Sequence, residues 1–330
     1  MSEDISIGVD LGGTKIEAAV IRETPSGSTP FTVLARRRVA TGADGGYASV
    51  LANTVSVIRE TAKEAGVDPL AVPVGLGLPG SVTRREGRIK NSNTQCLNGT
   101  PFRADVSRTL GREVLFENDA NCFALAEARL GAARQYSDGV VFGVIMGTGV
   151  GGGVVLNGRV WGGPQGLGGE WGHHAVGPWR RPTDLAAGPA RGVGLSERPP
   201  CSCGKMGCLE LYASGGGAEA EYFRRTGTRA RLADLLALRK TDAHAAAVFD
   251  ELLEAFGRGL ANVIDILDPT AVVLGGGVSN LELLYTEGRA RVQAYVFNDE
   301  LITPILPHAL GDSAGVIGAA LLHREGLSGA

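Results

Sequence analysis

Residues 5–21 read ISIGVDLGGTKIEAAVI, and this stretch decides how the chain begins to fold. Apolar and small residues alternate in Ile5–Asp10 and again in Ile16–Ile21, which predicts two strands. The glycine-rich segment between them is short enough to be a turn. The two strands are therefore expected to form a β-hairpin.

The turn of this hairpin carries the first candidate site, which consists of Asp10, Gly12, Gly13, Thr14 and Lys15. The glycines permit positive φ angles and the close approach of a phosphate, and successive backbone N–H groups in such a turn bind anions. Thr14 adds a hydroxyl donor, and Asp10 can hold a hydrated Mg²⁺ ion. The P-loop spacing G-x-x-x-x-G-K-[ST] is absent. A plain hairpin turn is the alternative interpretation.

A strand, a glycine turn and a second strand recur in the second half of the chain. Gly139–Met146 predicts a strand, Gly147–Gly153 a turn and Val154–Leu156 a returning strand, which favours two similarly built α/β halves. A third glycine loop follows the apolar strand Ala271–Leu274, and such loops line ligand sites at the strand ends of open α/β sheets. The candidate phosphate-binding residues of these two loops are Gly147, Thr148, Gly149, Gly275, Gly276 and Gly277.

The remaining elements follow from periodicity and end signals. Strands are predicted at Phe31–Ala40, Val72–Leu78 and Val114–Phe116, and helices at residues 47–62, 119–130, 249–267 and 314–324. Asn118 is expected to cap the second of these helices. Asp119 follows it, at the junction of strand and helix. Its carboxylate can act as a general base for an attacking hydroxyl, or it can simply stabilise the helix N-terminus.

Three of the five cysteines lie within eight residues, in Cys201-Ser-Cys203-Gly-Lys-Met-Gly-Cys208. Three thiolates and one imidazole would complete a closed, structural Cys₃His zinc site, with His173 or His174 as the fourth ligand. Glu170 and Glu210 flank this loop and are candidates to hydrogen-bond a polar ligand. A metal site of this kind indicates a reducing compartment rather than a disulfide framework.

Composition excludes several classes of protein. The chain has 330 residues, which favours two domains, and a net charge of −3 with both signs scattered along it. No basic stripe indicates nucleic-acid binding, and no apolar run is long enough to predict a membrane helix. The N-terminus lacks the pattern of a signal peptide, so a cytoplasmic location is expected.

Seven segments together resemble the ROK family (repressors, ORFs, kinases), whose sugar kinases have the actin/hexokinase-like, ribonuclease H-like ATPase fold. The segments are VDLGGTKIEAAVI at 9–21, GLGLPGSV at 75–82, ENDANCFALAEA at 117–128, MGTGVGGGVVLNG at 146–158, GEWGHH at 169–174, CSCGKMGCLE at 201–210 and LGGGVSN at 274–280. They occur in the family's order over nearly the whole chain. The resemblance implies a two-domain α/β protein, with residues 1–117 and a C-terminal helix at about 314–330 in one domain and residues 118–313, including a zinc-stabilised loop, in the other.

The resemblance also implies an activity: transfer of a phosphoryl group from ATP, with Mg²⁺, to a hexose. NSNTQCLNGTPF at 91–102 and GDSAGVIGAA at 311–320 are most similar to the fructokinase (manno(fructo)kinase) branch, which implies fructose as substrate and fructose 6-phosphate as product. N-acetylglucosamine or N-acetylmannosamine kinase and glucokinase are the alternatives. A sugar-responsive regulator is disfavoured, because the first strand begins too early for a DNA-binding domain to precede it. A homodimer is the family's usual assembly.

Individual roles are carried over from the family's motifs. Asp119 matches the catalytic base. The resemblance assigns sugar binding to Asn118, Glu170, His173 and Glu210, with Gly80 and Asn98 lining the sugar pocket. It assigns zinc binding to His173, Cys201, Cys203 and Cys208, and so favours His173 over His174. The 27 residues between His173 and Cys201 are longer and richer in Pro and Arg than in most relatives.

Overall fold

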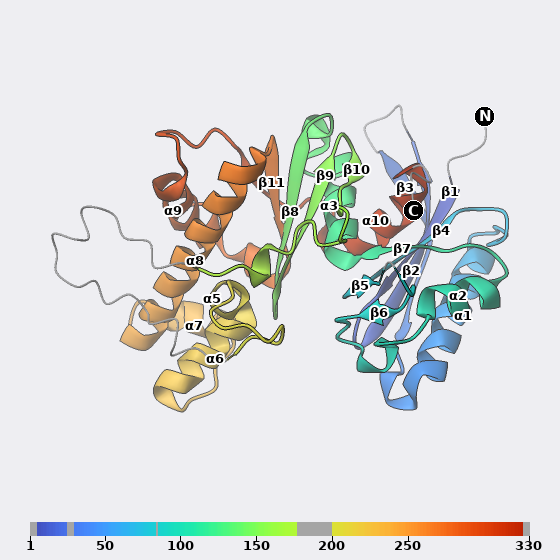
Figure 1. Cartoon of the computed structure of the whole chain (residues 1–330), viewed down its shortest axis with the longest axis horizontal. Coiled ribbons are helices and arrows are strands. Elements are labelled where there is room, and N and C mark those ends of the chain that lie inside the picture. The colour runs from blue at the N-terminus through green and yellow to red at the C-terminus, as the bar shows by residue number, and fades with distance from the viewer. Residues whose placement is uncertain (1–4, 25–29, 84, 177–199, 326–330) are drawn as a thin grey trace. The chain divides into compact units, whose positions relative to one another are not determined.

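The computed structural model describes residues 5–24, 30–83, 85–176 and 200–325. The chain divides into two compact units (Figure 1). The first unit takes its residues from 1–143, 153–169 and 308–330, and the second from 144–152 and 170–307. Most of the Pro- and Arg-rich excursion after His174 lies outside the described residues.

The first unit is built on a five-stranded sheet of order β3-β2-β1-β4-β7. Its strands are β1 (Ile5–Leu11), β2 (Lys15–Glu23), β3 (Phe31–Ala40), β4 (Val74–Leu78) and β7 (Leu115–Asn118). β2 is antiparallel to both β1 and β3, as the predicted hairpin requires, whereas β4 is parallel to both β1 and β7. A small ribbon of β5 (Ser81–Val82) and β6 (Ile89–Lys90) lies outside this sheet.

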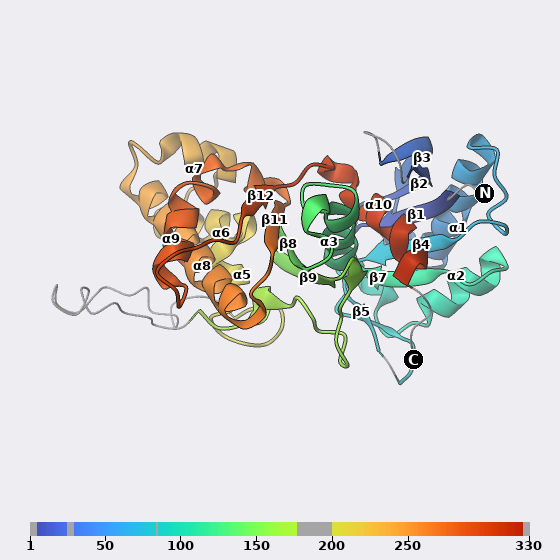
Figure 2. The same cartoon turned by 90° about the horizontal axis from the view of Figure 1, so that it is seen from above.

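Helices pack on the sheet of the first unit from both sides (Figures 1 and 2). These helices are α1 (Gly46–Glu64), α2 (Phe102–Leu110), α3 (Asp119–Arg129) and α10 (Ala314–Leu321). Ile7 and Val9 of β1 are fully buried in the apolar core that α1 and α2 share. Gly8, between them, faces the opposite way, because strand side chains alternate, and a Cβ there would overlap the carbonyl oxygen of Val316 in α10. Glycine therefore lets α10 approach the sheet closely.

A second five-stranded sheet has the order β10-β9-β8-β11-β12. Its strands are β8 (Val140–Met146), β9 (Val150–Leu156), β10 (Arg159–Val160), β11 (Ala271–Gly275) and β12 (Ile305–Pro307). The predicted turn at Gly147–Gly153 is too long, because β9 already begins at Val150. Gly143 and Gly153 lie against α3, where a Cβ on either would crowd Ala124. Their small size serves helix packing and not a turn.

Within the described residues, the helices of the second unit are α5 (Glu210–Ala213), α6 (Gly215–Thr226), α7 (Leu232–Leu238), α8 (Ala243–Leu267) and α9 (Glu287–Tyr295). The long helix α8 begins where the Asp242 side chain accepts the N–H groups of His244 and Ala245, which the prediction of a start near 249 missed. It ends as predicted before Asp268, which adopts a left-handed conformation at φ 43°.

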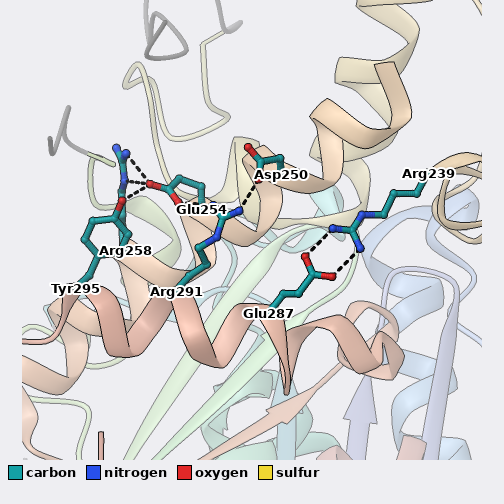
Figure 3. A network of polar contacts seen from close by, with 7 residues as sticks. All are labelled: Arg239, Asp250, Glu254, Arg258, Glu287, Arg291 and Tyr295. Carbon is teal, nitrogen blue, oxygen red and sulfur yellow. Dashed lines mark hydrogen bonds and ion pairs between the residues drawn. The ribbon is translucent and has the colours of Figure 1, made fainter. Parts of the chain in front are cut away.

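A network of ion pairs joins α8 to α9 (Figure 3). Glu254 accepts hydrogen bonds from Arg258, Arg291 and Tyr295. These partners lower the pKa of the Glu254 carboxyl, although burial opposes them with the largest single effect. Nearby, Arg239 and Glu287 form a bidentate ion pair, in which the two terminal guanidinium nitrogens lie 2.8 and 2.6 Å from the two carboxylate oxygens. The network links α9 to α8 and to Arg239 at the end of α7 (Leu232–Leu238), and each of its three arginines is paired with a carboxylate.

The predicted division at residue 117 does not coincide with the compact units, because α3 groups with the first unit. The carbonyl oxygen of Cys122 in α3 packs so closely against Gly318 of α10 that a Cβ there would overlap it. The division into functional domains at residue 117 stays a prediction. Among the described residues, no helix combines the length and the apolar character that crossing a membrane requires.

Candidate active site and metal centre

The turn between β1 and β2 presents Gly13, Thr14 and Lys15 to solvent. Thr41 braces it from behind: its hydroxyl donates to the carbonyl of Gly12 at 2.7 Å, and its N–H donates to the carbonyl of Thr14 at 3.0 Å. Gly12 and Gly13 do not have the positive φ that the sequence analysis allowed for them. A Cβ at Gly13 would also meet no protein atom within 4 Å. Nothing in the chain itself requires glycine there, which fits a position kept open for a ligand.

Asp10 lies at the end of β1, beside the first turn of α10, where a Cβ on Gly315 would be 3.2 Å from its carboxylate. Burial raises the pKa of the Asp10 carboxyl to about 6, helped by the negative charges of Asp119 and Glu17, while Lys15 opposes the shift. Asp10 and Asp119 are therefore near enough to repel each other. A cation placed between such carboxylates would remove this repulsion.

Asp119 is the first residue of α3, and its neighbours are tightly held. Asn118 caps the helix by accepting the N–H of Ala120 at 2.9 Å, as predicted, and its amide donates to the carbonyl of Gly80 at 3.0 Å. Glu117 accepts the N–H of Asn118 at 2.7 Å. One oxygen of Asp119 also accepts from Ala120, so the carboxylate has a defined orientation at the positive end of the helix.

Gly80 and Asn98, the predicted lining of a sugar pocket, belong to the same unit as Asp119. Gly80 has φ 103°, and a Cβ there would lie 2.5 Å from the carbonyl oxygen of Lys90, so its own turn requires glycine. Asn98 accepts the N–H of Ser92 at 2.9 Å and donates back to its carbonyl at 3.0 Å. The structure joins Gly80 to Asn118 directly, whereas Asn98 braces a neighbouring loop.

The other two glycine loops meet in the second unit. Gly276 has φ 80°, and a Cβ on it would collide with the backbone of Met146, immediately before Gly147. Gly147 and Gly277 have no positive φ, and a Cβ on either would meet no atom within 4 Å. The loops at Gly147–Gly149 and Gly275–Gly277 therefore lie side by side, with Thr148, Gly276 and Gly277 exposed and Gly275 buried at the end of β11. Their role in binding ATP stays a prediction.

His173, Cys201, Cys203 and Cys208 form one cluster, with all ligand atoms within 4.8 Å of one another. The Cys203 and Cys208 sulfurs are 3.5 Å apart, and the Cys201 sulfur is 3.6 Å from Nδ1 of His173. Zn–S bonds of about 2.3 Å and Zn–N bonds of about 2.0 Å imply S···S edges of about 3.8 Å and S···N edges of about 3.5 Å in a tetrahedron. The four side chains therefore fit a zinc ion.

The chemistry of the cluster also suits a cation. Burial and then the neighbouring thiols raise the pKa of Cys208 to about 12, so a bound cation is the natural means of keeping the Cys208 sulfur as a thiolate. His174 lies outside the cluster, with its ring 6.5 Å from that of Trp171. Of the two histidines that spacing alone left open, the geometry selects His173.

Glu170 and Glu210 flank the cluster in different ways. The side chain of Glu170 is exposed at the start of a short 3₁₀ turn, Trp171–His173. Glu210 is half-buried: it accepts the N–H of Val150 at 3.0 Å and lies 3.7 Å from the thiol of Cys201. Trp171 is buried and donates to the carbonyl of Gly151 at 2.9 Å, so it belongs to the core.

Sequence reasoning did not single out several residues that hold the site. Thr41 donates to the first glycine turn and Glu117 accepts from Asn118, while Gly315 leaves room beside the Asp10 carboxylate. Glu117 directly precedes Asn118, and this adjacency was the one available signal. Thr41 and Gly315 are distant in sequence from the groups they contact, so no local pattern reveals them.

Known proteins share both the sequence and the fold. The ROK family model matches residues 6–325. N-acetyl-D-glucosamine kinase of Photobacterium profundum is 36% identical over 320 residues, which cover 96% of this chain and 98% of the relative. The ROK hexokinase of Thermus thermophilus superimposes with a TM-score of 0.77 at 33% identity, covering 96% of this chain and 97% of that one.

A ROK family glucokinase from Streptomyces griseus, solved with glucose and AMPPNP, has a TM-score of 0.72 at 28% identity and covers 98% of this chain and 100% of its own. The predicted α/β, actin/hexokinase-like fold is confirmed by these matches. Because the family model spans nearly the whole chain and a curated relative exceeds 30% identity over almost its full length, the chain belongs to the ROK family.

Proposed function

We propose that this protein is a sugar kinase that transfers the γ-phosphoryl group of ATP to the primary hydroxyl of a hexose, with Asp119 as general base. The observation that carries the proposal is the position of Asp119 as the first residue of α3, near enough to Asp10 at the first glycine turn for the two negative charges to repel each other. Phosphoryl transfer needs one carboxylate to orient and deprotonate the hydroxyl. It needs another group to hold the metal ion that neutralises the phosphate charge.

The proposed reaction balances without a further reactant. The sugar hydroxyl oxygen attacks the γ-phosphorus, its proton passes to Asp119, and the bond from the γ-phosphorus to the bridging oxygen breaks to release ADP. The backbone N–H groups of the three glycine loops would hold the phosphates. Mg²⁺ would neutralise the phosphate charge, with Asp10 as the side chain that holds it through water.

N-acetyl-D-glucosamine is the hexose we propose first, because the similar curated relatives carry that activity in their names. Fructose, the first choice from the sequence resemblance, gains no support from these relatives. Glucose is the second candidate, because the solved structures include a glucokinase at 28% identity. Sugar contacts remain predictions for Gly80, Asn98, Asn118, Glu170, His173 and Glu210. These sugars differ in one or two polar groups, and a single unmatched buried polar group can change kcat/KM strongly.

A steady-state assay of ADP release with N-acetylglucosamine, N-acetylmannosamine, glucose and fructose tests the proposal. We expect the highest kcat/KM with N-acetylglucosamine, and a 6-phosphate product by ³¹P NMR. A sugar-free reaction is the control for ATP hydrolysis. If no hexose stimulates ADP release, the kinase assignment is wrong. If fructose gives the highest kcat/KM, only the choice of sugar is wrong.

Three further properties belong to this proposal. Zinc in the Cys/His cluster would be structural, because four protein ligands leave no open coordination position. We propose a cytoplasmic location as well, because three closely spaced thiols suit a metal site in a reducing compartment. The homodimer stays a prediction, and light scattering coupled to size-exclusion chromatography will test it.

A further inference from the structure

Glu210 contacts both the metal cluster and the second glycine turn. Its Oε2 accepts the N–H of Val150 at 3.0 Å, and a Cβ on Gly149 would lie 2.5 Å from the same oxygen. Its Oε1 is 3.7 Å from the sulfur of Cys201. One carboxylate therefore bridges two sites that the sequence analysis treated separately.

The backbone around Glu210 is fixed by the cluster. Cys208, two residues earlier, is one of the four grouped side chains, and it pairs with Ala175 through an isolated β-bridge. The N–H of Leu209 donates to the carbonyl of His174 at 3.0 Å, next to the grouped His173. The position of Glu210 is thus set by the two chain segments that carry the ligands.

The segment that follows Glu210 holds the other end of the glycine turn. The N–H of Gly215 donates to the carbonyl of Gly147 at 2.8 Å. A Cβ on Gly216 would lie 2.5 Å from the carbonyl oxygen of Thr148, so the start of α6 is packed directly behind the turn. Residues 210–216 therefore contact the turn from Gly147 to Val150 along its whole length.

We propose that Glu210 is a positioning residue that couples metal occupancy of the Cys/His cluster to the shape of the Gly147–Gly149 turn, so that zinc raises the affinity for nucleotide. The coupling rests on the proposed kinase function and is separate from the sugar contact predicted for Glu210. Groups close to metal ligands commonly change metal affinity or activity 10- to 100-fold when they are removed. Coupling between two sites is reciprocal, so nucleotide must then strengthen zinc binding by the same factor.

The test measures AMPPNP binding by calorimetry at fixed Mg²⁺ and without sugar, so that a lost sugar contact cannot affect the result. In the wild-type protein, removal of zinc should weaken AMPPNP binding at least about fivefold. With zinc present, Glu210→Ala should bind AMPPNP more weakly than the wild type. Removal of zinc from this variant should then change its Kd for AMPPNP less than about twofold. This non-additivity is the signature of coupling through Glu210.

The matched control is Glu170→Ala, which removes another predicted sugar contact and should keep the full zinc dependence. Should zinc removal unfold the protein, the Kd for zinc, measured by equilibrium competition with a chelator, decides instead: AMPPNP should lower this Kd about fivefold in the wild type but not in Glu210→Ala. Equal zinc dependence in both proteins, or none in the wild type, overturns the coupling alone. A zinc-loaded wild type that binds no AMPPNP overturns the kinase proposal as well.

Discussion

Glu127 of α3 accepts the backbone N–H of Leu310 at 2.9 Å, across 183 residues of sequence. The same fully buried carboxylate accepts the N–H groups of Ala309 at 3.1 Å and of Ala132 at 2.8 Å. Leu310 precedes α10, whose first turn lies beside Asp10. A single side chain thus fixes the returning chain against the helix that begins with Asp119.

Glu127→Gln should reduce the free energy of unfolding by about 2–4 kcal/mol, measured by urea titration. The amide keeps one acceptor oxygen but turns an NH₂ group toward a backbone donor, which leaves buried N–H groups without a partner. Glu60→Gln is the control: Glu60 pairs with Arg37 at the surface, and its loss should change stability by less than about 0.5 kcal/mol. Equal losses of unfolding free energy in the two variants would show that the buried hydrogen bonds of Glu127 stabilise the fold no more than a surface ion pair does.

Asp119→Asn should lower kcat at least about 10²-fold while the Kd values for AMPPNP and sugar change less than about threefold, because the amide keeps the shape but cannot accept a proton. Stopped-time ADP assays and calorimetry measure the two effects. Asp44→Asn, at an exposed position, should retain wild-type turnover. Near-normal kcat in Asp119→Asn would remove the general base from the mechanism.

Asp10 should give the pH–rate profile an ionisation near 6, with activity lost toward acid as the carboxylate becomes protonated. Its pKa in the folded protein lies above the ordinary value of 3.8, so the folded state binds more protons than the unfolded state between those values. Stability from this group is therefore present below pH 3.8 and is lost as pH rises through about 6.

Asp10→Asn should consequently stabilise the protein at pH 7, by up to about 2–3 kcal/mol, while abolishing turnover. Thermal unfolding at pH 4 and pH 7 measures the first effect, and the gain should be small at the lower pH. If Asp10→Asn were less stable than the wild type at pH 7, the ionised Asp10 carboxylate would be stabilised by its partners and not destabilised by burial.

Two glycines near the first turn should respond in opposite ways to alanine. Gly8→Ala should destabilise the protein by about 3 kcal/mol or more, because its Cβ would overlap the carbonyl of Val316. Gly13→Ala should leave the unfolding free energy within about 0.5 kcal/mol, since its Cβ meets no protein atom and its φ is not positive. Gly13→Ala should nevertheless raise the KM for ATP about tenfold, because its methyl group would occupy the space of a phosphate. An unchanged KM would show that no phosphate lies against Gly13.

The local parts of the fold and site were predictable from the sequence, because short-range rules decide them. The alternation in 5–21 predicted the hairpin of β1 and β2, and Asn118 predicted the start of α3, since a capping side chain needs only the next turn of its own helix. The spacing of Cys201, Cys203 and Cys208 predicted that they would gather, because two glycines let a chain of eight residues close on itself.

Only the tertiary structure decided which distant groups meet. It placed His173 beside Cys201, Glu210 against Val150, and Glu127 against Leu310. It also showed that Gly143 and Gly153 serve the packing of α3. The sequence pattern of a segment predicts whether it forms a helix, a strand or a turn, whereas these contacts depend on how whole elements pack against one another. That is settled by shape, burial and the demand that each buried polar group find a partner.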